Sequence, residues 1–305
     1  MKKMYLLMPF MALALASCSN DDEAVNSHSA GLNVKVALNN PGSRALITDD
    51  YFADGTEIGI FMTETDGSAY DDQTTGYTNV SYSSTGTGAS QTWTATDGAI
   101  MLSATNGKAI AYYPWNEDND DMTAIPLETA SQTDYMYSNS QTVNNEDTDA
   151  VFVMSHALTA VRVKIINDSY SGAGKVTQIS ITSTNFATAG TMDITDGTVS
   201  YTSGTEGIGV SLPVADGSKT VAGAPYTNEY MLVPTGTNGE MEINVWMDGK
   251  LFSNKLNLTA AALSGYIYTI ELSAKNNSMG VSKVTIAPWL EGETVTGDMT
   301  IVDSE

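Results

Sequence analysis

Apolar and polar residues alternate with a period of two along much of this chain. Such alternation, in short runs rich in Val, Ile, Thr and Tyr, is typical of strands that bury one face. The clearest runs cover residues 32–38, 161–165, 243–247 and 267–272. The nearest approach to a helix is residues 259–263, a single turn that Gly265 would end. The pattern predicts an all-β protein of the sandwich type.

Turn residues separate the predicted strands. Asp196-Gly197 and Asp248-Gly249 each stand between two short apolar runs. An Asp-Gly pair favours the positive φ angles of a tight hairpin turn. We therefore expect a tight hairpin at each of these two positions.

The length of the chain indicates two domains. It has 305 residues, of which 42% are hydrophobic, enough for two separate cores. Residues 116–121 and 144–149 are rich in Asp, Glu and Asn and mark connections. We place the domain boundary at the second run, so that residues 31–148 form an N-terminal sandwich and residues 149–305 a C-terminal one. Oxygen-rich runs also occur at calcium sites, but neither run has the ligand spacing and central glycine of an EF-hand loop, which favours solvated loops.

Charge and residue counts exclude several classes of function. The chain has 13 Lys and Arg against 36 Asp and Glu, a formal net charge of −23 at pH 7. Nucleic acid, itself a polyanion, would be repelled. One cysteine allows no intrachain disulfide and no cysteine-cluster zinc site, and two histidines leave little material for catalysis or metal binding. We expect no catalytic residue, no cofactor and no metal.

The residues that could carry chemistry have simpler structural interpretations. His28 lies in a polar segment where no pocket can form. His156 follows an apolar run, where a histidine is typically a hydrogen-bonding structural residue. Trp93 and Trp246 could stack on sugars, but they lie in predicted strands and fit core or sheet-face positions. A glycosidase with paired carboxylates is a distant alternative, because the abundance of acids carries no geometric information.

The N-terminus has the features of a lipoprotein signal peptide. Lys2 and Lys3 precede an apolar run over residues 4–16, which is too short to cross a bilayer comfortably. The sequence Leu15-Ala16-Ser17-Cys18 resembles a bacterial lipobox, in which the cysteine is acylated and becomes the new N-terminus. The alternative is an ordinary signal peptide with a cysteine near its cleavage site.

An acidic tether follows the predicted lipidation site. Residues 1–17 would be removed, and residues 18–30 would connect the lipid on Cys18 to the folded chain. The acidic residues within 19–23 cannot collapse onto a core, and they resemble the stretch that routes certain lipoproteins to the outer face of the outer membrane. The lipid would be the only contact with the membrane.

Six short segments occur in a recognisable order along the chain. They are residues 59–61, 111–115, 134–138, 155–165, 263–268 and 284–289. Together they resemble the fimbrillin family, the Mfa-like type V pilins of anaerobic Gram-negative bacteria. The resemblance implies two tandem transthyretin-like β-sandwich domains, a lipoprotein precursor, and polymerisation into fimbriae after proteolysis. It also implies that His156, Tyr112, Tyr113 and Trp115 are core residues and not a site.

The resemblance further implies a maturation cut. In such pilins an arginine-directed, trypsin-like protease releases the first strand. Here residues 41–45 form an exposed-looking turn that contains Arg44, whereas the only other arginine, Arg162, lies in a predicted strand. Cleavage of the Arg44–Ala45 bond would remove strand 32–38 and open a groove that another subunit's strand can fill. The alternative for Arg44 is an ordinary loop arginine.

The donor strand for that groove would come from the segment after Trp289. Residues 294–296 and 299–302 alternate only briefly, and they could instead close their own domain. A chain with a donor strand would be a stalk subunit, and one without it would be a tip.

The leading hypothesis is therefore a structural fimbrial subunit that supports adhesion, located at the outer membrane and in the fimbrium. Its partners would be other fimbrial subunits. The alternative is a monomeric surface lipoprotein that binds a glycan or a host protein through its loops.

Overall fold

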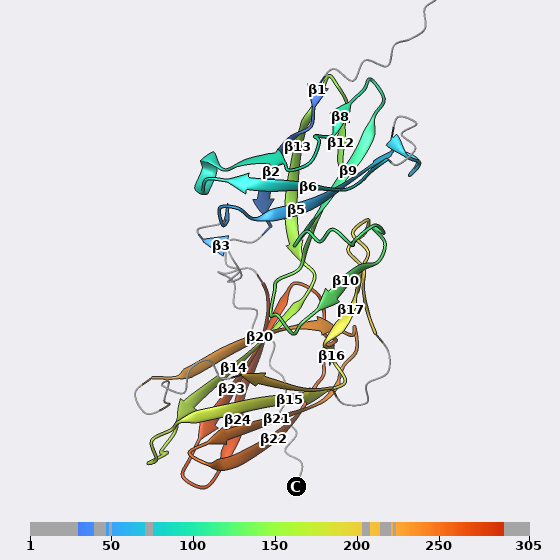
Figure 1. The fold of residues 1–305 in the computed structure, drawn as a ribbon. Coiled ribbons are helices and arrows are strands. Elements are labelled where there is room, and N and C mark those ends of the chain that lie inside the picture. The colour runs from blue at the N-terminus through green and yellow to red at the C-terminus, as the bar shows by residue number, and fades with distance from the viewer. Residues whose placement is uncertain are drawn as a thin grey trace, which may run out of the picture.

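The protein is built almost entirely from β-strands. The computed structural model describes residues 30–39, 47–48, 51–70, 76–202, 208–213, 221 and 224–289. Among these residues helix is confined to short 3-10 turns such as η2 (Gly88–Ser90), and none of them forms a helix long and apolar enough to cross a membrane. The predicted all-β sandwich is confirmed, with two sandwiches arranged one after the other (Figure 1).

The first sandwich contains an eight-stranded sheet in the order β2-β13-β11-β9-β5-β6-β7, with β12 paired to β9. Tyr82, Phe152 and Ile60 are fully buried in its core. Two-stranded ladders β1–β8 and β3–β4 complete this half. The strands are β1 (Ala30–Gly31), β2 (Asn33–Leu38), β3 (Ile47–Thr48), β4 (Tyr51–Phe52), β5 (Glu57–Glu64), β6 (Tyr77–Thr85), β7 (Thr92–Ala95), β8 (Met101–Leu102), β9 (Gly107–Tyr113), β11 (Met136–Ser138), β12 (Gln141–Val143) and β13 (Asp149–His156).

The second sandwich packs a five-stranded sheet, β16-β20-β14-β23-β24, against a four-stranded sheet, β19-β15-β21-β22. Alternate side chains of both sheets, such as Val163, Ile243 and Ile270, are fully buried between them. The strands are β14 (Thr159–Asn167), β15 (Val176–Ser183), β16 (Phe186–Ala187), β19 (Ile208–Pro213), β20 (Tyr226–Pro234), β21 (Gly239–Met247), β22 (Lys250–Leu258), β23 (Tyr266–Ala274) and β24 (Met279–Pro288).

A small third sheet lies where the two sandwiches meet (Figure 1). It joins β10 (Ile125–Glu128) to β17 (Ala189–Met192) and β18 (Val199–Tyr201). A separate apolar cluster forms around it and takes side chains from both halves of the chain, including Tyr112, Leu158 and Val233. The two sandwiches therefore share a packed junction.

Strand pairing favours a domain boundary later in the chain than the one expected from the sequence. We placed the boundary between residues 148 and 149, but β13 pairs with β2 and β11 of the first sheet. Its inward side chains Ala150, Phe152 and Met154 belong to the first core. Pairing changes to the second sandwich only at β14, so the strand arrangement favours a boundary at Ala157–Leu158. The acidic run 144–149 is the connection that leads into β13, and its last residue already lies in that strand.

Of the two tight hairpins predicted at Asp-Gly pairs, one is present and the other is replaced by a longer loop. At Asp248-Gly249 the tight hairpin is confirmed, because Met247 pairs with Lys250 and both turn residues have positive φ. At Asp196-Gly197 the strands do pair, but Met192 opposes Val199, so the loop covers residues 193–198. Gly197 has positive φ there, and the ring of Tyr137 occupies the place that a Cβ would take.

Residues 259–263, the nearest approach to a helix in the sequence, do not form a helical turn. The segment is irregular because its backbone groups bond to other segments. The amide of Ala262 donates to the Thr237 carbonyl at 3.0 Å, and the Tyr268 hydroxyl donates to the Ala261 carbonyl at 2.7 Å. A five-residue helix would have too few internal hydrogen bonds to compete with these contacts.

A buried polar contact fixes the junction. Nδ1 of His156, at the end of β13, lies 2.8 Å from Oδ2 of Asp134, and both side chains are buried. The indole of Trp289, the residue after β24, stacks on the His156 ring with 4.0 Å between ring centroids and 9° between planes. We call Asp134, His156 and Trp289 the junction clamp. It confirms His156 as a structural, hydrogen-bonded residue.

Backbone hydrogen bonds tie the same segments together. The amide of Ala157 donates to the Tyr135 carbonyl, the amide of Gly265 to the Leu158 carbonyl, and the amide of Trp289 to the Gly265 carbonyl. The crossing from β13 to β14 is thus bonded to the residues just before β11 and β23, and the residue before β23 is in turn bonded to the residue after β24.

Replacement of His156 by alanine tests the junction clamp. The substitution removes a hydrogen-bond partner of the buried Asp134 carboxylate and the ring on which Trp289 stacks, so we expect the free energy of unfolding to fall by about 2–4 kcal/mol. Chemical denaturation followed by circular dichroism measures this. His28→Ala, in the predicted tether, is the matched control and should leave the midpoint unchanged. Equal midpoints for both variants would contradict a stabilising role for the clamp.

Candidate functional site: the leading strand and its slot

The first described residues form a strand that lies between two others. We call residues 30–38, which comprise β1 and β2, the leading strand. β2 pairs in parallel with β13, from Asn33 opposite Asp149 to Leu38 opposite Met154. On the other side β1 pairs antiparallel with β8, and the amide of Leu32 donates to the Ile100 carbonyl at 2.9 Å. β2 also approaches β7. The leading strand therefore closes the gap between β13 and the β7–β8 side of the first sandwich, and we call that gap the slot.

The inward side chains of the leading strand complete the first core. Leu32 and Val34 are buried, and Val36 and Leu38 are partly buried against the same cluster. Burial of one such side chain contributes about 1.5–3 kcal/mol. This arrangement confirms the two-residue alternation read from the sequence, and it means that an empty slot would expose an apolar groove.

The outward face of the leading strand is polar. The carboxylate of Asp149 accepts hydrogen bonds from Lys35 Nζ and Asn33 Nδ2, each at 2.6 Å. These two bonds lower the pKa of Asp149 from its ordinary value. Because the cluster is exposed, it adds little stability, but it favours one register of β2 on β13.

The leading strand ends beside the junction. The amide of Asn39 donates to the Met154 carbonyl at 2.8 Å, and its side chain donates to Ser155 Oγ at 3.0 Å. A cavity of about 290 Å³ is lined by Asn39, His156 and Trp289, among others. The end of the leading strand and the last described residue of the chain thus lie on one cavity, although they are far apart in sequence.

Several predicted site residues lie outside the described part of the chain. They are the lipidation site Cys18, the cleavage site Arg44–Ala45, and the donor candidates at residues 294–296 and 299–302. Asn39, the residue that follows the leading strand, precedes Arg44 by only a few residues in the sequence. Arg162 lies in β14 as expected, where its guanidinium makes an ion pair with Glu229 at 2.7 Å.

Two features of this region were not identified from the sequence. Asp149 was assigned to an acidic connection, although it is the partner of Lys35 and Asn33. The alternation that starts at Asp149, with Ala150, Phe152 and Met154 pointing inward, is the signal that could have placed it in a strand.

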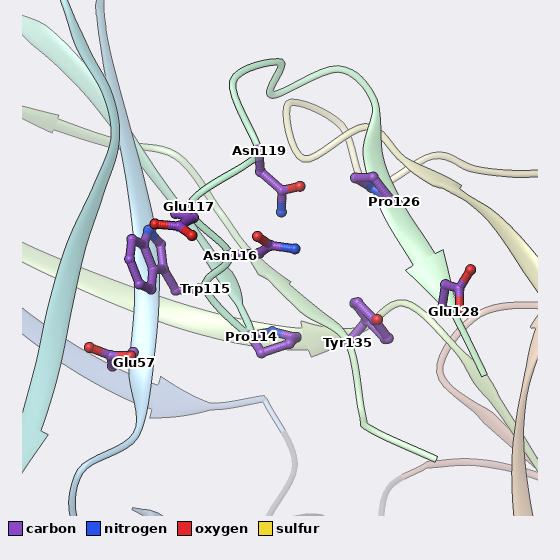
Figure 2. A pocket seen from close by; sticks show the side chains of 9 residues that line it. All are labelled: Glu57, Pro114, Trp115, Asn116, Glu117, Asn119, Pro126, Glu128 and Tyr135. Atoms are coloured by element: carbon purple, nitrogen blue, oxygen red, sulfur yellow. The ribbon is translucent and has the colours of Figure 1, made fainter. Parts of the chain in front are cut away.

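The second feature is the position of Trp115. The resemblance implied that Tyr112, Tyr113 and Trp115 are all core residues. Tyr112 and Tyr113 are buried, but Trp115 is only partly buried and lines a cavity (Figure 2). The difference follows from the chain direction: Trp115 lies in the loop after β9, where the backbone has already left the sheet.

The acidic runs use their oxygens for local turns. Asn116 Oδ1 accepts from the Asp118 amide, Asp121 Oδ1 from the Thr123 amide, and Asn144 Oδ1 from the Glu146 amide. Within the described ranges, no group of three or more His, Cys, Asp or Glu is placed to hold a metal ion. These contacts are those of turns that stabilise solvated loops.

Comparison with known proteins gives consistent results. The family model described as fimbrillin-like matches residues 43–289. None of the curated proteins matches the chain. Solved structures with a similar fold include candidate cell adhesion proteins from Bacteroides uniformis, at 22% identity with a TM-score of 0.66, and from Bacteroides ovatus, at 17% identity with a TM-score of 0.69. These alignments cover 85% and 87% of this chain and 98% and 99% of the respective relatives. At such identities the structures show a shared fold, and the family match over most of the sequence shows membership: this chain belongs to the fimbrillin-like family.

Proposed function

We propose that this protein is a structural subunit of a surface fimbria that polymerises when the leading strand is replaced by a strand of another subunit. Its membership of the fimbrillin-like family supports a fimbrial or adhesive role. The observation that carries the finer proposal is the double-sided position of the leading strand, between β13 and β8 and on the N-terminal side of Arg44.

Cleavage after Arg44 would leave the leading strand bound only by non-covalent contacts. Its departure would free the backbone groups of residues 149–154 along the edge of β13 and expose the core beneath Leu32 and Val34. An exposed strand edge above an apolar groove favours addition of another strand, because main-chain hydrogen bonds provide affinity and alternate side chains set the register.

The replacement strand must present apolar side chains at every second position. In the leading strand these are Leu32, Val34, Val36 and Leu38. In the C-terminal segment Val295, Met299 and Ile301 share one two-residue phase, and Gly297 is the second of the four positions in this phase. This phase matches the requirement of the slot, and it supports the C-terminal segment as the donor.

The N-terminal segment would hold the precursor at the membrane before cleavage. Lipid on Cys18 would retain the chain at the outer membrane, and cleavage at Arg44 would separate the body from both the lipid and the leading strand. A single cut would thus couple release from the anchor to exposure of the slot.

Arginine-specific proteolysis tests the cleavage step. Arg162 is paired within β14, so an arginine-specific protease should cut the folded precursor only after Arg44 and yield a body that begins at Ala45 and forms oligomers. Intact-mass analysis and size-exclusion chromatography measure both results. Arg44→Ala should abolish cleavage and assembly, while Arg162→Ala, the control, should still be cut. Normal fibres from Arg44→Ala would refute the maturation step, and a cut body that stays monomeric would favour the surface-binding lipoprotein.

Charge insertion into the C-terminal segment tests the donor. Ile301→Asp would place a carboxylate in the apolar slot, so we expect polymers to be reduced at least about tenfold, because burial of an unpaired charge costs several kcal/mol. Thr300→Asp carries the same charge in the outward phase and should assemble normally. Polymer length on detergent gels and by electron microscopy provides the measurement. Loss of assembly in both variants, or in neither, would argue against residues 295–301 as the inserted strand.

A further inference from the structure

A second surface feature lies away from the slot. A cavity of about 550 Å³ opens between the loop after β9 and the strand β10, and no residue of the leading strand or of β13 lines it. Figure 2 shows Trp115, Glu57 and Glu117 on one side of this cavity and Glu128 and Tyr135 on the other. A volume of this size suits a small ligand or one side chain of a partner.

The charged groups of the cavity are all acidic. Glu57, Glu117 and Glu128 contribute carboxylates, and no Lys or Arg is among the lining residues. None of the ion pairs within the described ranges involves these three residues. Burial raises the pKa of Tyr135, and the nearby charge of Glu128 acts in the same direction. The cavity therefore has a negative potential that no basic residue of its lining offsets.

The carboxylates do not converge on one point. Within the part of the chain that the structure describes, no three acidic or other metal-ligating side chains are grouped closely enough to hold a metal ion. Instead the acids stand around the cavity, with aromatic rings between them (Figure 2). This spacing fits an extended organic cation better than a bare metal ion.

The aromatic wall is held in place before any ligand arrives. Trp115 donates its indole N–H to the Asn79 carbonyl at 3.2 Å, so the ring needs no hydrogen-bond partner from a ligand. The loop below it is fixed by the Asn79 side chain, which donates to the Asn116 carbonyl at 2.7 Å, and by the buried Asn119, which donates to the Tyr112 hydroxyl at 3.1 Å. A rigid aromatic face beside carboxylates is an arrangement that stacks a planar cation.

We propose that this cavity binds the guanidinium group of an arginine side chain presented by a partner polypeptide. Trp115 would stack on the planar group, and Glu57, Glu117 and Glu128 would supply the opposing charge. Arginine suits the site better than lysine because its flat, forked cation can stack and hydrogen-bond at once. A neutral sugar would leave the three carboxylates without an opposing charge, and an anionic ligand would be repelled. The inference does not depend on strand exchange, since the cavity is complete in the uncleaved chain.

Nuclear magnetic resonance titration of the uncleaved protein tests the proposal. The probes are blocked tripeptides with a central arginine or glutamine, and methyl glucoside. The arginine peptide should shift the indole N–H signal of Trp115, identified by its loss in Trp115→Phe, with a dissociation constant in the millimolar range that rises with salt. The glutamine peptide and the glucoside should leave the signal in place.

Isosteric variants separate the cavity from the general acidity of the chain. Glu57→Gln and Glu128→Gln should each weaken arginine-peptide binding by about 2- to 5-fold without unfolding the protein, as expected for loss of one solvent-accessible charge pair. Glu146→Gln removes the same charge from an exposed loop and should have no effect. A shift with glucoside alone, equal binding of the two peptides, or equal weakening by Glu146→Gln would each overturn the proposal.

Discussion

The parallel ladder between β2 and β13 is the constraint on which the first sandwich depends. It joins residues 116 positions apart, from Asn33 to Asp149, and it covers an edge of β13 whose inward side chains form part of the core. The same strand continues to His156, where the junction clamp begins. One strand therefore connects the slot to the junction, and both the closure of the core and the attachment of the second sandwich rest on its position.

Much of this architecture follows from local patterns. Alternation identified the leading strand and the central strands of the second sandwich because one buried face is enough to impose a period of two. The sequence suggests an earlier boundary than the strand pairing favours, because Asp149 has the composition of a loop residue although it occupies an outward strand position. At Asp196-Gly197 the glycine marked the turn, but the loop length depends on the pairing of Met192 with Val199 and on the packing of Tyr137, which no local signal contains.

The cavity beside Trp115 could not be predicted from local sequence patterns. Its far wall is β10, and β10 is placed by pairing with β17, which lies more than sixty residues later in the chain. A sequence pattern around Trp115 cannot report a neighbour that distant. The wall around Trp115 and Glu117 was therefore visible in the sequence as an aromatic stretch and an acidic run, but its meeting with Glu128 and Tyr135 was not.

The slot and the cavity would recognise partners by different means. The slot, once empty, would offer backbone groups and an apolar groove and would accept many side chains in the correct phase, whereas the cavity, with its fixed charges and ring, would discriminate by chemical group. Assembly and recognition could thus vary independently on one scaffold, because no residue that lines the cavity takes part in the β2–β13 ladder.

The polar contacts of Asp149 with Asn33 and Lys35, at the edge of the slot, bear on which subunits could be joined. Asp149 takes both of its hydrogen bonds from Asn33 and Lys35, and both donors would depart with the leading strand. The carboxylate would then stand at the rim of an otherwise apolar groove. If strand exchange takes place as proposed, an arriving segment with an amide, hydroxyl or ammonium at that point would be favoured over one with an acid, and Asp149 would select among competing chain ends.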